Sequence, residues 1–340
     1  MTEDRPPRRF PAEWEPHRAT WIAWPHNRET WPGVYEQIPA AFTALIRALR
    51  LFEEVRLLVP DALTRAAVTR RDDLGEGHPL RIIEAETDDA WIRDYGPIFT
   101  RTASGELLAT LWRFNAWGGK YSPWERDARA GREVASWSGV PAESIDRVLE
   151  GGSVDSNGGG ALLTSESCLL NPNRNPGMSR QEIEAMLRRH LGVRRVFWLG
   201  GGIAGDDTDG HVDDVARFVD ERTVAAAVEH DPHDPNHAPL KDNLERLQRM
   251  KDRKGRALRV VELPMPEPVS HAGERMPASY VNFLIVNGGV LVPTYRNGRD
   301  ERALDVLRGL FPGRQVVGID CSELILGLGG VHCLTLEQPA

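Results

Sequence analysis

The stretch Gly205-Asp-Asp-Thr-Asp-Gly-His211-Val-Asp213-Asp214 runs directly into the apolar segment 215–219 and decides how the rest of the chain is interpreted. It gathers five carboxylates and one imidazole within ten residues, a composition suited to holding a cationic group. An EF-hand calcium loop is excluded, because Gly205 and Ala216 would occupy its first and closing ligand positions and neither carries a carboxylate.

The pair His211 and Asp213 lies at the entrance to this apolar segment. On a strand, side chains two residues apart point to the same side, so we expect these two to face one site. An imidazole beside a carboxylate is suited to general acid/base catalysis. For Asp206, Asp207 and Asp209 taken alone, a solvated acidic turn is the alternative interpretation.

The apolar segments after this stretch, 216–219 and 224–228, form one of four hairpin patterns, each preceded by a polar residue. The patterns recur about every 50 to 70 residues, which indicates a repeated structural unit. The other three are 98–100 with 107–112 after Asp94, 161–163 with 168–170 after Glu150, and 283–286 with 290–294 after Tyr280-Val-Asn282.

Helical periodicity separates the hairpins. Apolar spacing predicts helices over 35–51, 62–70, 179–191, 240–251 and 300–310, and strands over 19–25, 54–60 and 81–85. Ser179 followed three residues later by Glu182 is a capping box that starts one of these helices.

Repeated strand-strand-helix units bury their faces when they are arranged around an axis. Equivalent positions at the hairpin entrances then converge, so Asp94, Glu150, His211 and Asp213 would form one constellation. Ordinary α/β alternation without such symmetry is the alternative. We expect residues 1–10 to be disordered and residues 11–340 to form a single catalytic domain.

The C-terminal stretch Gly327-Leu-Gly329-Gly330-Val331-His332-Cys333 is a glycine-rich approach to a short strand. Glycines permit close backbone approach to a ligand or a strained turn. Cys333 enters the convergent set at the corresponding repeat position, whereas Cys168 and Cys321 are predicted to be small buried hydrophobes. An odd number of cysteines without metal-ligand spacing indicates a reducing compartment.

Composition limits the classes of partner. A chain of 340 residues with 41% hydrophobic residues can bury a large core, and a net charge of −8 argues against nucleic acid or an anionic membrane as partner. The N-terminal residues lack the apolar core of a signal peptide, and no segment is long and apolar enough for a membrane span. We therefore expect a cytoplasmic protein.

Ordered motifs along nearly the whole chain resemble the porphyromonas-type peptidyl-arginine deiminase family, in particular its agmatine deiminase branch, within the guanidino-group-modifying superfamily. The motifs are Pro11-Ala-Glu-Trp-Glu-Pro-His17, Trp91-Ile-Arg-Asp-Tyr-Gly-Pro97, Phe114-Asn-Ala-Trp-Gly-Gly119, Glu150-Gly-Gly-Ser153, Asn171-Pro-Asn-Arg-Asn-Pro176, Thr208-Asp-Gly-His-Val-Asp213, Pro277-Ala-Ser-Tyr-Val-Asn-Phe283 and Gly329-Gly-Val-His-Cys333.

The resemblance implies an α/β fold, a five-bladed propeller of strand-strand-helix-strand units with pseudo-fivefold symmetry. It also implies hydrolysis of agmatine to N-carbamoylputrescine and ammonia through a covalent cysteine thiouronium, without metal or other cofactor. By the same resemblance Cys333 is the nucleophile, His211 the acid/base and Glu150 its neighbour, and Asp94 and Asp213 grip the guanidinium nitrogens.

The rest of the substrate is less well defined by the sequence. Asp206 and Asp207 are candidate ligands for a distal ammonium, and Trp91 and Trp117 are candidate walls for an alkyl chain, with a surface turn and core packing as alternatives. The expected partner is a small cationic guanidino substrate, and a homodimer is the candidate assembly.

Three other functions stay open at this stage. A deiminase of peptidyl or free arginine is the alternative enzyme, and a catalytically silent propeller that binds cationic metabolites is the alternative binding protein. A metal hydrolase built on His211, Asp213 and the loop His230-Asp-Pro-His233-Asp-Pro-Asn-His237 is the third, although the prolines of that loop favour turns.

Overall fold

The computed structural model describes residues 8–252 and 254–340. The predicted disorder of residues 1–7 lies outside the described residues. Residues 8–10, which were expected to belong to a disordered N-terminus that ends at residue 10, make defined contacts. Arg9 and Arg101 exchange backbone hydrogen bonds of 2.9 and 2.8 Å, and Phe10 packs against a buried apolar cluster. These contacts fix the start of the described chain to the first hairpin.

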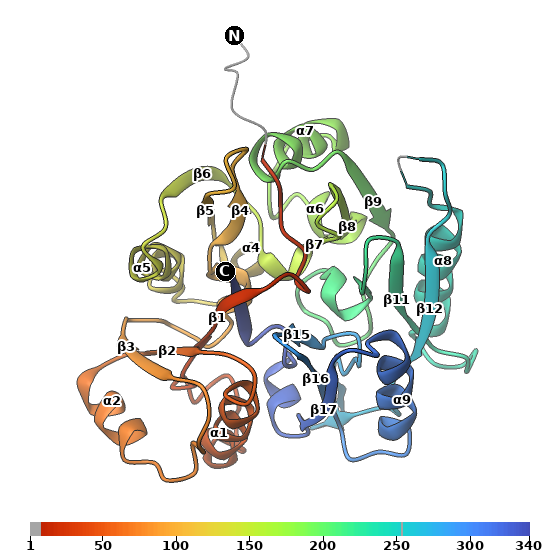
Figure 1. The fold of residues 1–340 in the computed structure, drawn as a ribbon. Helices are drawn as coiled ribbons and strands as arrows, with labels where there is room; N and C mark the ends of the chain where they lie inside the picture. The colour runs from red at the N-terminus through yellow and green to blue at the C-terminus, as the bar shows by residue number, and fades with distance from the viewer. Residues whose placement is uncertain (1–7, 253) are drawn as a thin grey trace.

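The structure is a mixed α/β fold whose sheets lie around a common centre, with the longer helices on the outside (Figure 1). The sheet orders in the described residues are β18-β1-β2-β3, β4-β5-β6, β7-β8-β9, β10-β11-β12 and β15-β16-β17, with a small β13-β14 pair. None of these sheets, within residues 8–252 and 254–340, closes on itself.

The strands occupy short segments along the whole described chain. They are β1 (His17–Ala23), β2 (Val55–Val59), β3 (Leu80–Glu84), β4 (Ile98–Arg101), β5 (Leu107–Arg113), β6 (Ala142–Val148), β7 (Asp155–Ser156), β8 (Ala161–Ser165), β9 (Arg195–Leu199), β10 (Ala216–Phe218), β11 (Thr223–Val228), β12 (Arg259–Pro264), β13 (Ser270–His271), β14 (Glu274–Arg275), β15 (Leu284–Val286), β16 (Gly289–Thr294), β17 (Gln315–Asp320) and β18 (Thr335–Pro339).

The helices alternate with these strands. The α-helices are α1 (Ile38–Leu49), α2 (Ala62–Thr69), α3 (Ile92–Tyr95), α4 (Ala116–Gly119), α5 (Asp127–Ser138), α6 (Glu166–Leu169), α7 (Arg180–Leu191), α8 (His237–Arg249) and α9 (Asp300–Leu310), and the 3-10 turns are η1 (Tyr35–Gln37), η2 (Gly151–Ser153), η3 (Val212–Asp214) and η4 (Leu324–Gly327).

Each larger sheet repeats one pattern of strand directions. In the fourth unit β10 pairs with β11 antiparallel, and helix α8 then carries the chain to β12, which pairs with β11 parallel. A parallel neighbour needs such a crossover, whereas an antiparallel neighbour needs only a tight turn. The sheets that start with β4, β7 and β15 have the same order of antiparallel and parallel pairs, and β18, β1 and β2 reproduce it with strands from both ends of the chain.

Most predicted elements are confirmed. The helix expected over 300–310 is α9. The capping box predicted at Ser179 is present at the start of α7: the Ser179 side chain accepts from the Glu182 backbone N–H, and the Glu182 carboxylate accepts from the Ser179 backbone N–H. Three of the four hairpins, at β4-β5, β10-β11 and β15-β16, also match the expected segments.

One hairpin was placed wrongly. The strands around Glu150 are β7 and β8, whose turn is the glycine-rich run 157–160, and the segment 168–170 that was expected to be the second strand begins inside helix α6. The Asn157 side chain accepts hydrogen bonds from Gly159 and Ala161 at 2.9 Å and so builds the turn. The pair Asn157-Gly158 is a stronger turn signal than the polar segment between residues 163 and 168, where the turn was expected.

Helix α5 was not predicted, because it buries mainly small residues that give weak apolar periodicity. A β-carbon on Gly131 of this helix would lie 2.8 Å from the Tyr95 carbonyl oxygen, so the helix packs closely against α3. This contact fixes α3, the element that carries Asp94.

No helix within residues 8–252 and 254–340 combines the length and apolar character that a membrane crossing requires.

Candidate active site

The polar residues at the hairpin entrances meet at the centre of the fold. Asp94 lies in α3, Glu150 precedes η2, and His211 and Asp213 flank and form η3. The backbone of Gly152 touches three of these groups: a β-carbon added there would lie 2.6 Å from His211 Nδ1, 2.9 Å from Asp94 Oδ1 and 3.1 Å from Asp213 Oδ2. Any larger residue at position 152 would clash with these three side chains, so the site requires glycine here.

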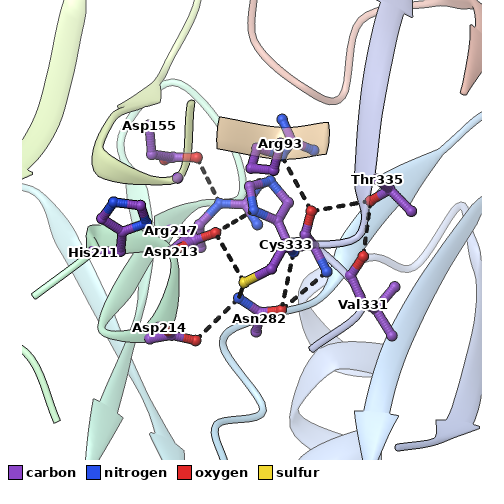
Figure 2. A network of polar contacts seen from close by, with 12 residues as sticks. Arg93, Asp155, His211, Asp213, Asp214, Arg217, Asn282, Val331, Cys333 and Thr335 are labelled. Carbon is purple, nitrogen blue, oxygen red and sulfur yellow. Dashed lines mark hydrogen bonds and ion pairs between the residues drawn. The ribbon is translucent and has the colours of Figure 1, made fainter. Parts of the chain in front are cut away.

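Cys333 reaches the same place from the C-terminal end of the chain. It lies in a turn before β18, not on the strand that was expected. The Asn282 side-chain amide donates to Cys333 Sγ at 3.1 Å, and Asp213 Oδ2 lies 3.8 Å from the same sulfur (Figure 2). The thiol is half-buried, so it is accessible from one side.

Asp94 is held by two donors. Trp117 Nε1 donates to Oδ2 at 2.9 Å, and the Gly152 backbone donates to Oδ1 at 2.9 Å. Burial raises the pKa of Asp94; His211 opposes this shift, and the nearby Asp213 and Glu150 add to it. Trp117, expected as a wall of the site, therefore also orients a carboxylate.

His211 precedes a 3-10 turn and does not lie on a strand, so the predicted strand alternation of His211 and Asp213 is wrong. The turn nevertheless brings both side chains to Gly152. His211 Nδ1 lies 3.7 Å from Asp94 Oδ1. Burial alone would lower the pKa of His211, but Asp94, the Cys168 thiol and Glu150 together raise it well above its usual range. The imidazolium form is favoured at neutral pH.

Glu150 is fully buried beside His211. Arg174 Nε donates to Glu150 Oε1 at 2.5 Å, and the arginine is itself held by backbone oxygens of Trp117 and Thr208 at 3.0 and 2.8 Å. Arg174 belongs to the motif 171–176, so this motif orients the carboxylate. Cys168, buried as predicted, has its sulfur within 4.8 Å of ligand atoms of both Glu150 and His211.

Among the described residues, three buried polar atoms at this centre have no hydrogen-bond partner: Glu150 Oε2, His211 Nε2 and Asp213 Oδ1. Buried polar groups without a partner are rare in native proteins because each costs desolvation free energy. The two carboxylate oxygens are acceptors that a bound molecule with N–H donors would satisfy, whereas Nε2 of the His211 imidazolium is a donor.

The charges around Cys333 favour its neutral form. Burial raises the pKa of the Cys333 thiol well above its usual range, and the carboxylates Asp213, Asp214 and Asp94 add to this shift. Burial opposes ionisation of Asp213 as well, but its hydrogen bond to His332 lowers the pKa of Asp213 below the usual value. A cationic ligand would reverse the effect of the carboxylates on the thiol.

A cavity of about 630 Å³ opens onto Cys333 and Asp94. Trp91 and Trp117 line it, as expected for apolar walls, and the carboxylates Asp89, Asp127 and Asp207 line it as well. A β-carbon on Gly329 would lie 2.3 Å from the Trp91 ring, which explains why glycine precedes Cys333 in this loop. The cavity is suited to a cation with an apolar stem.

The two candidate tail ligands differ. Asp206 binds its own loop: its carboxylate accepts from the backbones of Thr208 at 2.7 Å and Gly210 at 2.8 Å and does not line the cavity. Asp207 lines the cavity and accepts a hydrogen bond from the Tyr121 hydroxyl. Burial raises the pKa of Asp207, and the adjacent Asp206 adds to the shift.

Asn282, at the centre, was not identified as a site residue from the sequence. Asn282 contacts Cys333 Sγ and also donates to Asp214 Oδ1 at 3.0 Å, so it links the thiol to an acidic residue of the opening stretch. The position of Asn282 at a hairpin entrance, equivalent to Asp94, was the signal that could have included it.

Some side chains of the described residues are grouped closely enough to hold a metal ion. Two clusters have donor atoms within 4.8 Å of one another, Glu150-Cys168-His211 and Asp213-Asp214-Cys333. His230, His233 and His237 belong to neither cluster, so the loop considered for a metal hydrolase does not meet His211 and Asp213.

The fold and the site define a guanidino-modifying enzyme class: the sequence model of the porphyromonas-type peptidyl-arginine deiminase family matches residues 9–339, and the chain belongs to this family. It is 41% identical to the agmatine deiminase of Ectopseudomonas mendocina over 355 residues, covering 97% of this chain and 95% of the relative. The structure of the Enterococcus faecalis agmatine deiminase superimposes with a TM-score of 0.91 at 34% identity, covering 98% of this chain and 96% of that one. A dimethylarginine dimethylaminohydrolase shares the fold alone, with a TM-score of 0.53 at 17% identity, covering 94% of this chain and 99% of that one.

Proposed function

We propose that this enzyme is an agmatine deiminase that hydrolyses the agmatine guanidinium to a urea, forming N-carbamoylputrescine and ammonia. The observation that carries the proposal is the group of side chains at Gly152, where His211, Asp94 and Asp213 meet, with Asp213 Oδ2 3.8 Å from the Cys333 sulfur. The curated relative and the solved structure at 41% and 34% identity are both agmatine deiminases.

In this proposal Asp94 and Asp213 hold the guanidinium. The cation is planar and carries N–H donors on its edges, so carboxylates bind it through charge-assisted hydrogen bonds in the plane. The open oxygen of Asp213 accepts from one nitrogen, and Asp94 accepts from another. One face of the central carbon then stays free for Cys333 Sγ.

The reaction proceeds in two halves. The Cys333 thiolate forms a bond to the guanidinium carbon, His211 gives a proton to the departing nitrogen, and the carbon–nitrogen bond breaks to release ammonia and leave a covalent thiouronium. His211 then takes a proton from water, whose oxygen attacks the same carbon. The carbon–sulfur bond breaks, the hydroxyl proton of the adduct passes to solvent, and the neutral urea product and the Cys333 thiolate are released.

The substrate supplies the charge that activates the nucleophile. In the free site the three carboxylates and burial hold Cys333 as the thiol. A bound guanidinium carries one positive charge and offsets part of the negative charge of Asp94 and Asp213, so it lowers the free-energy cost of ionising the sulfur. Ionisation is thus coupled to occupancy of the site by a cation.

The cavity accounts for the rest of the substrate. Trp91 and Trp117 contact the tetramethylene stem, and Asp207 faces the distal ammonium. Asp206 shapes the loop that presents Asp207, through its bonds to Thr208 and Gly210. An α-carboxylate, as in free or peptidyl arginine, would approach the acidic lining and be disfavoured by charge repulsion.

Ammonia release from agmatine, free arginine and an arginyl peptide, measured side by side, tests the proposal. We expect turnover of agmatine with kcat/KM at least about 100-fold above the other two, because each unmatched charge costs several kcal/mol at a buried site. Preferential turnover of either arginine compound would assign the alternative substrate. No ammonia from any of the three would contradict the deiminase assignment.

We also propose that the five larger sheets form a five-bladed propeller with pseudo-fivefold symmetry, and that the enzyme works in the cytoplasm. The shared order of antiparallel and parallel strand pairs supports the first proposal. The three cysteines are unpaired, as a reducing compartment would keep them.

A further inference from the structure

Behind the site, a buried imidazole joins two carboxylates. His332 Nδ1 lies 2.6 Å from Asp213 Oδ2, and His332 Nε2 lies 2.8 Å from Glu13 Oε2. All three side chains are at least nine-tenths buried. These side chains form a line in the order Asp213, His332, Glu13. His332 immediately precedes Cys333, and Glu13 comes from the N-terminal motif 11–17, so the line connects the two ends of the chain.

Both ring nitrogens of His332 face carboxylate oxygens at hydrogen-bond distance. One nitrogen is held by Asp213 and the other by Glu13, so the ring is fixed in its plane from both sides.

Glu13 is fixed independently of His332. Its Oε2 also pairs with Arg217 Nη2 at 2.7 Å, and its Oε1 accepts from the Ile285 backbone at 2.7 Å. Arg217 is held in turn by Asp155 at 2.6 Å (Figure 2). The far end of the line is thus tied to β10, β7 and β15, so Glu13 offers His332 a fixed partner.

The near end of the line has one bound and one open oxygen. His332 occupies Asp213 Oδ2, and Asp213 Oδ1 has no partner. A partial rotation of the carboxylate would break the bond to His332 and turn both oxygens away from their present directions. Because the open oxygen is the one that binds the guanidinium in the proposed function, its direction matters for alignment of the substrate.

We propose that His332 is a positioning residue, which fixes the Asp213 carboxylate so that its open oxygen faces the guanidinium. Glu13 acts one step further back, by holding His332 in place. The inference rests on the proposed function, since it assigns Asp213 Oδ1 to the substrate.

The two ring nitrogens allow a test with two conservative variants. The side-chain amide nitrogen of asparagine sits close to the position of Nδ1, and that of glutamine close to the position of Nε2. His332→Asn thus keeps a donor for Asp213 and loses the contact to Glu13, which retains Arg217. His332→Gln keeps the contact to Glu13 and loses the donor for Asp213.

We expect His332→Gln to lower kcat/KM for agmatine about 10- to 100-fold, and His332→Asn to stay within about 5-fold of the parent enzyme. The same order should hold for agmatine affinity, measured by calorimetry in a Cys333→Ser background that cannot turn over. In an Asp213→Asn background, His332→Gln should cost less than about 2-fold more, because its route of action is already removed.

His17→Gln is the matched control for the loss of a buried histidine. His17 belongs to the same motif as Glu13 and pairs with Glu53 at 3.2 Å, so its loss tests stability without touching Asp213. We expect a lower melting temperature and unchanged kcat/KM in this variant.

Equal losses in His332→Asn and His332→Gln, or losses that add to that of Asp213→Asn, would overturn the positioning role. If His332→Gln does not fold, the affinity of the folded His332→Asn decides: a loss of more than about 10-fold would overturn the role as well. A parent enzyme that binds agmatine but releases no ammonia would instead contradict the proposed function alone.

Discussion

The two sides of Asp213 contrast sharply. Asp213 Oδ1, like Glu150 Oε2 and His211 Nε2, is buried without a hydrogen-bond partner among the described residues. Asp213 Oδ2, which lies 3.8 Å from the Cys333 sulfur, begins a continuous series of contacts through His332, Glu13 and Arg217. Burial is the same on both sides, and only the pairing differs.

This difference separates scaffold from site. Buried ions that are fully paired hold elements together, and removing one partner costs stability because the other charge is left uncompensated. Buried polar atoms that are unpaired mark the place where a ligand completes the structure. The front, at Asp213 and the unpaired atoms, should therefore respond to substitution in turnover. The far end of the back, at Arg217 and Asp155 beyond His332 and Glu13, should respond mainly in stability.

The largest effect is expected for Cys333→Ser. The hydroxyl keeps the shape of the thiol but ionises far less readily, so kcat should fall more than about 1,000-fold while the fold and agmatine binding are retained. Turnover and calorimetric binding measured on the same preparation check this. Substantial residual activity would remove Cys333 from its role as nucleophile.

The front and the back can then be compared directly. Asp213→Asn removes a charge-assisted partner of the guanidinium, for which about 1.5–3 kcal/mol is typical, so kcat/KM should fall about 10- to 100-fold. Asp155→Asn breaks a pair with Arg217 on the back side and should cost mainly stability, about 3 kcal/mol. Urea unfolding and kinetics on both variants measure the contrast, which fails if the two variants lose stability and turnover in the same proportion.

A moderate effect is expected from the charge around the thiol. Since its pKa is raised, Cys333 is the protonated thiol below that pKa and becomes a thiolate as the pH rises through it. Alkylation of the free enzyme by iodoacetamide should therefore be about 10-fold slower than that of a free thiol at pH 8 and continue to accelerate up to pH 10. A rate that levels off below pH 8 would show a thiolate that is already formed in the empty site.

The smallest effect should separate the two neighbouring carboxylates of the tail region. Asp207→Asn should weaken kcat/KM for agmatine about 5- to 10-fold and leave ethylguanidine nearly unchanged, because only agmatine carries a second cation. Asp206→Asn, which perturbs the loop, should affect both compounds equally. Equal losses on both compounds for Asp207→Asn would show that it shapes the loop and does not contact the tail.

The sequence predicted the repeated units well, because each hairpin and helix has its own local signal. The helix at 300–310 and the hairpin at β10-β11 follow from apolar periodicity alone. The hairpin after Glu150 and helix α5 were missed where short strands and small buried residues weaken that periodicity. The identity of the site residues depended on the family resemblance, since spacing gives no distances between units.

The paired side of the site could not be predicted in the same way. Glu13 and His332 are 319 residues apart, and each has an ordinary structural explanation when considered alone. Their contact exists only because β18 and β1 join the two ends of the chain in one sheet. Asn282 was overlooked because a neutral amide carries no charge signal, although it stands at an equivalent hairpin entrance.

The most direct test is the mass of the enzyme quenched with acid during turnover of agmatine, followed by peptide mapping. We expect a covalent adduct of agmatine less ammonia on the peptide that contains Cys333, present in the parent enzyme and absent from Cys333→Ser. An adduct on Cys168 or Cys321, or rapid ammonia release with an unmodified Cys333 at every quench time, would contradict the account.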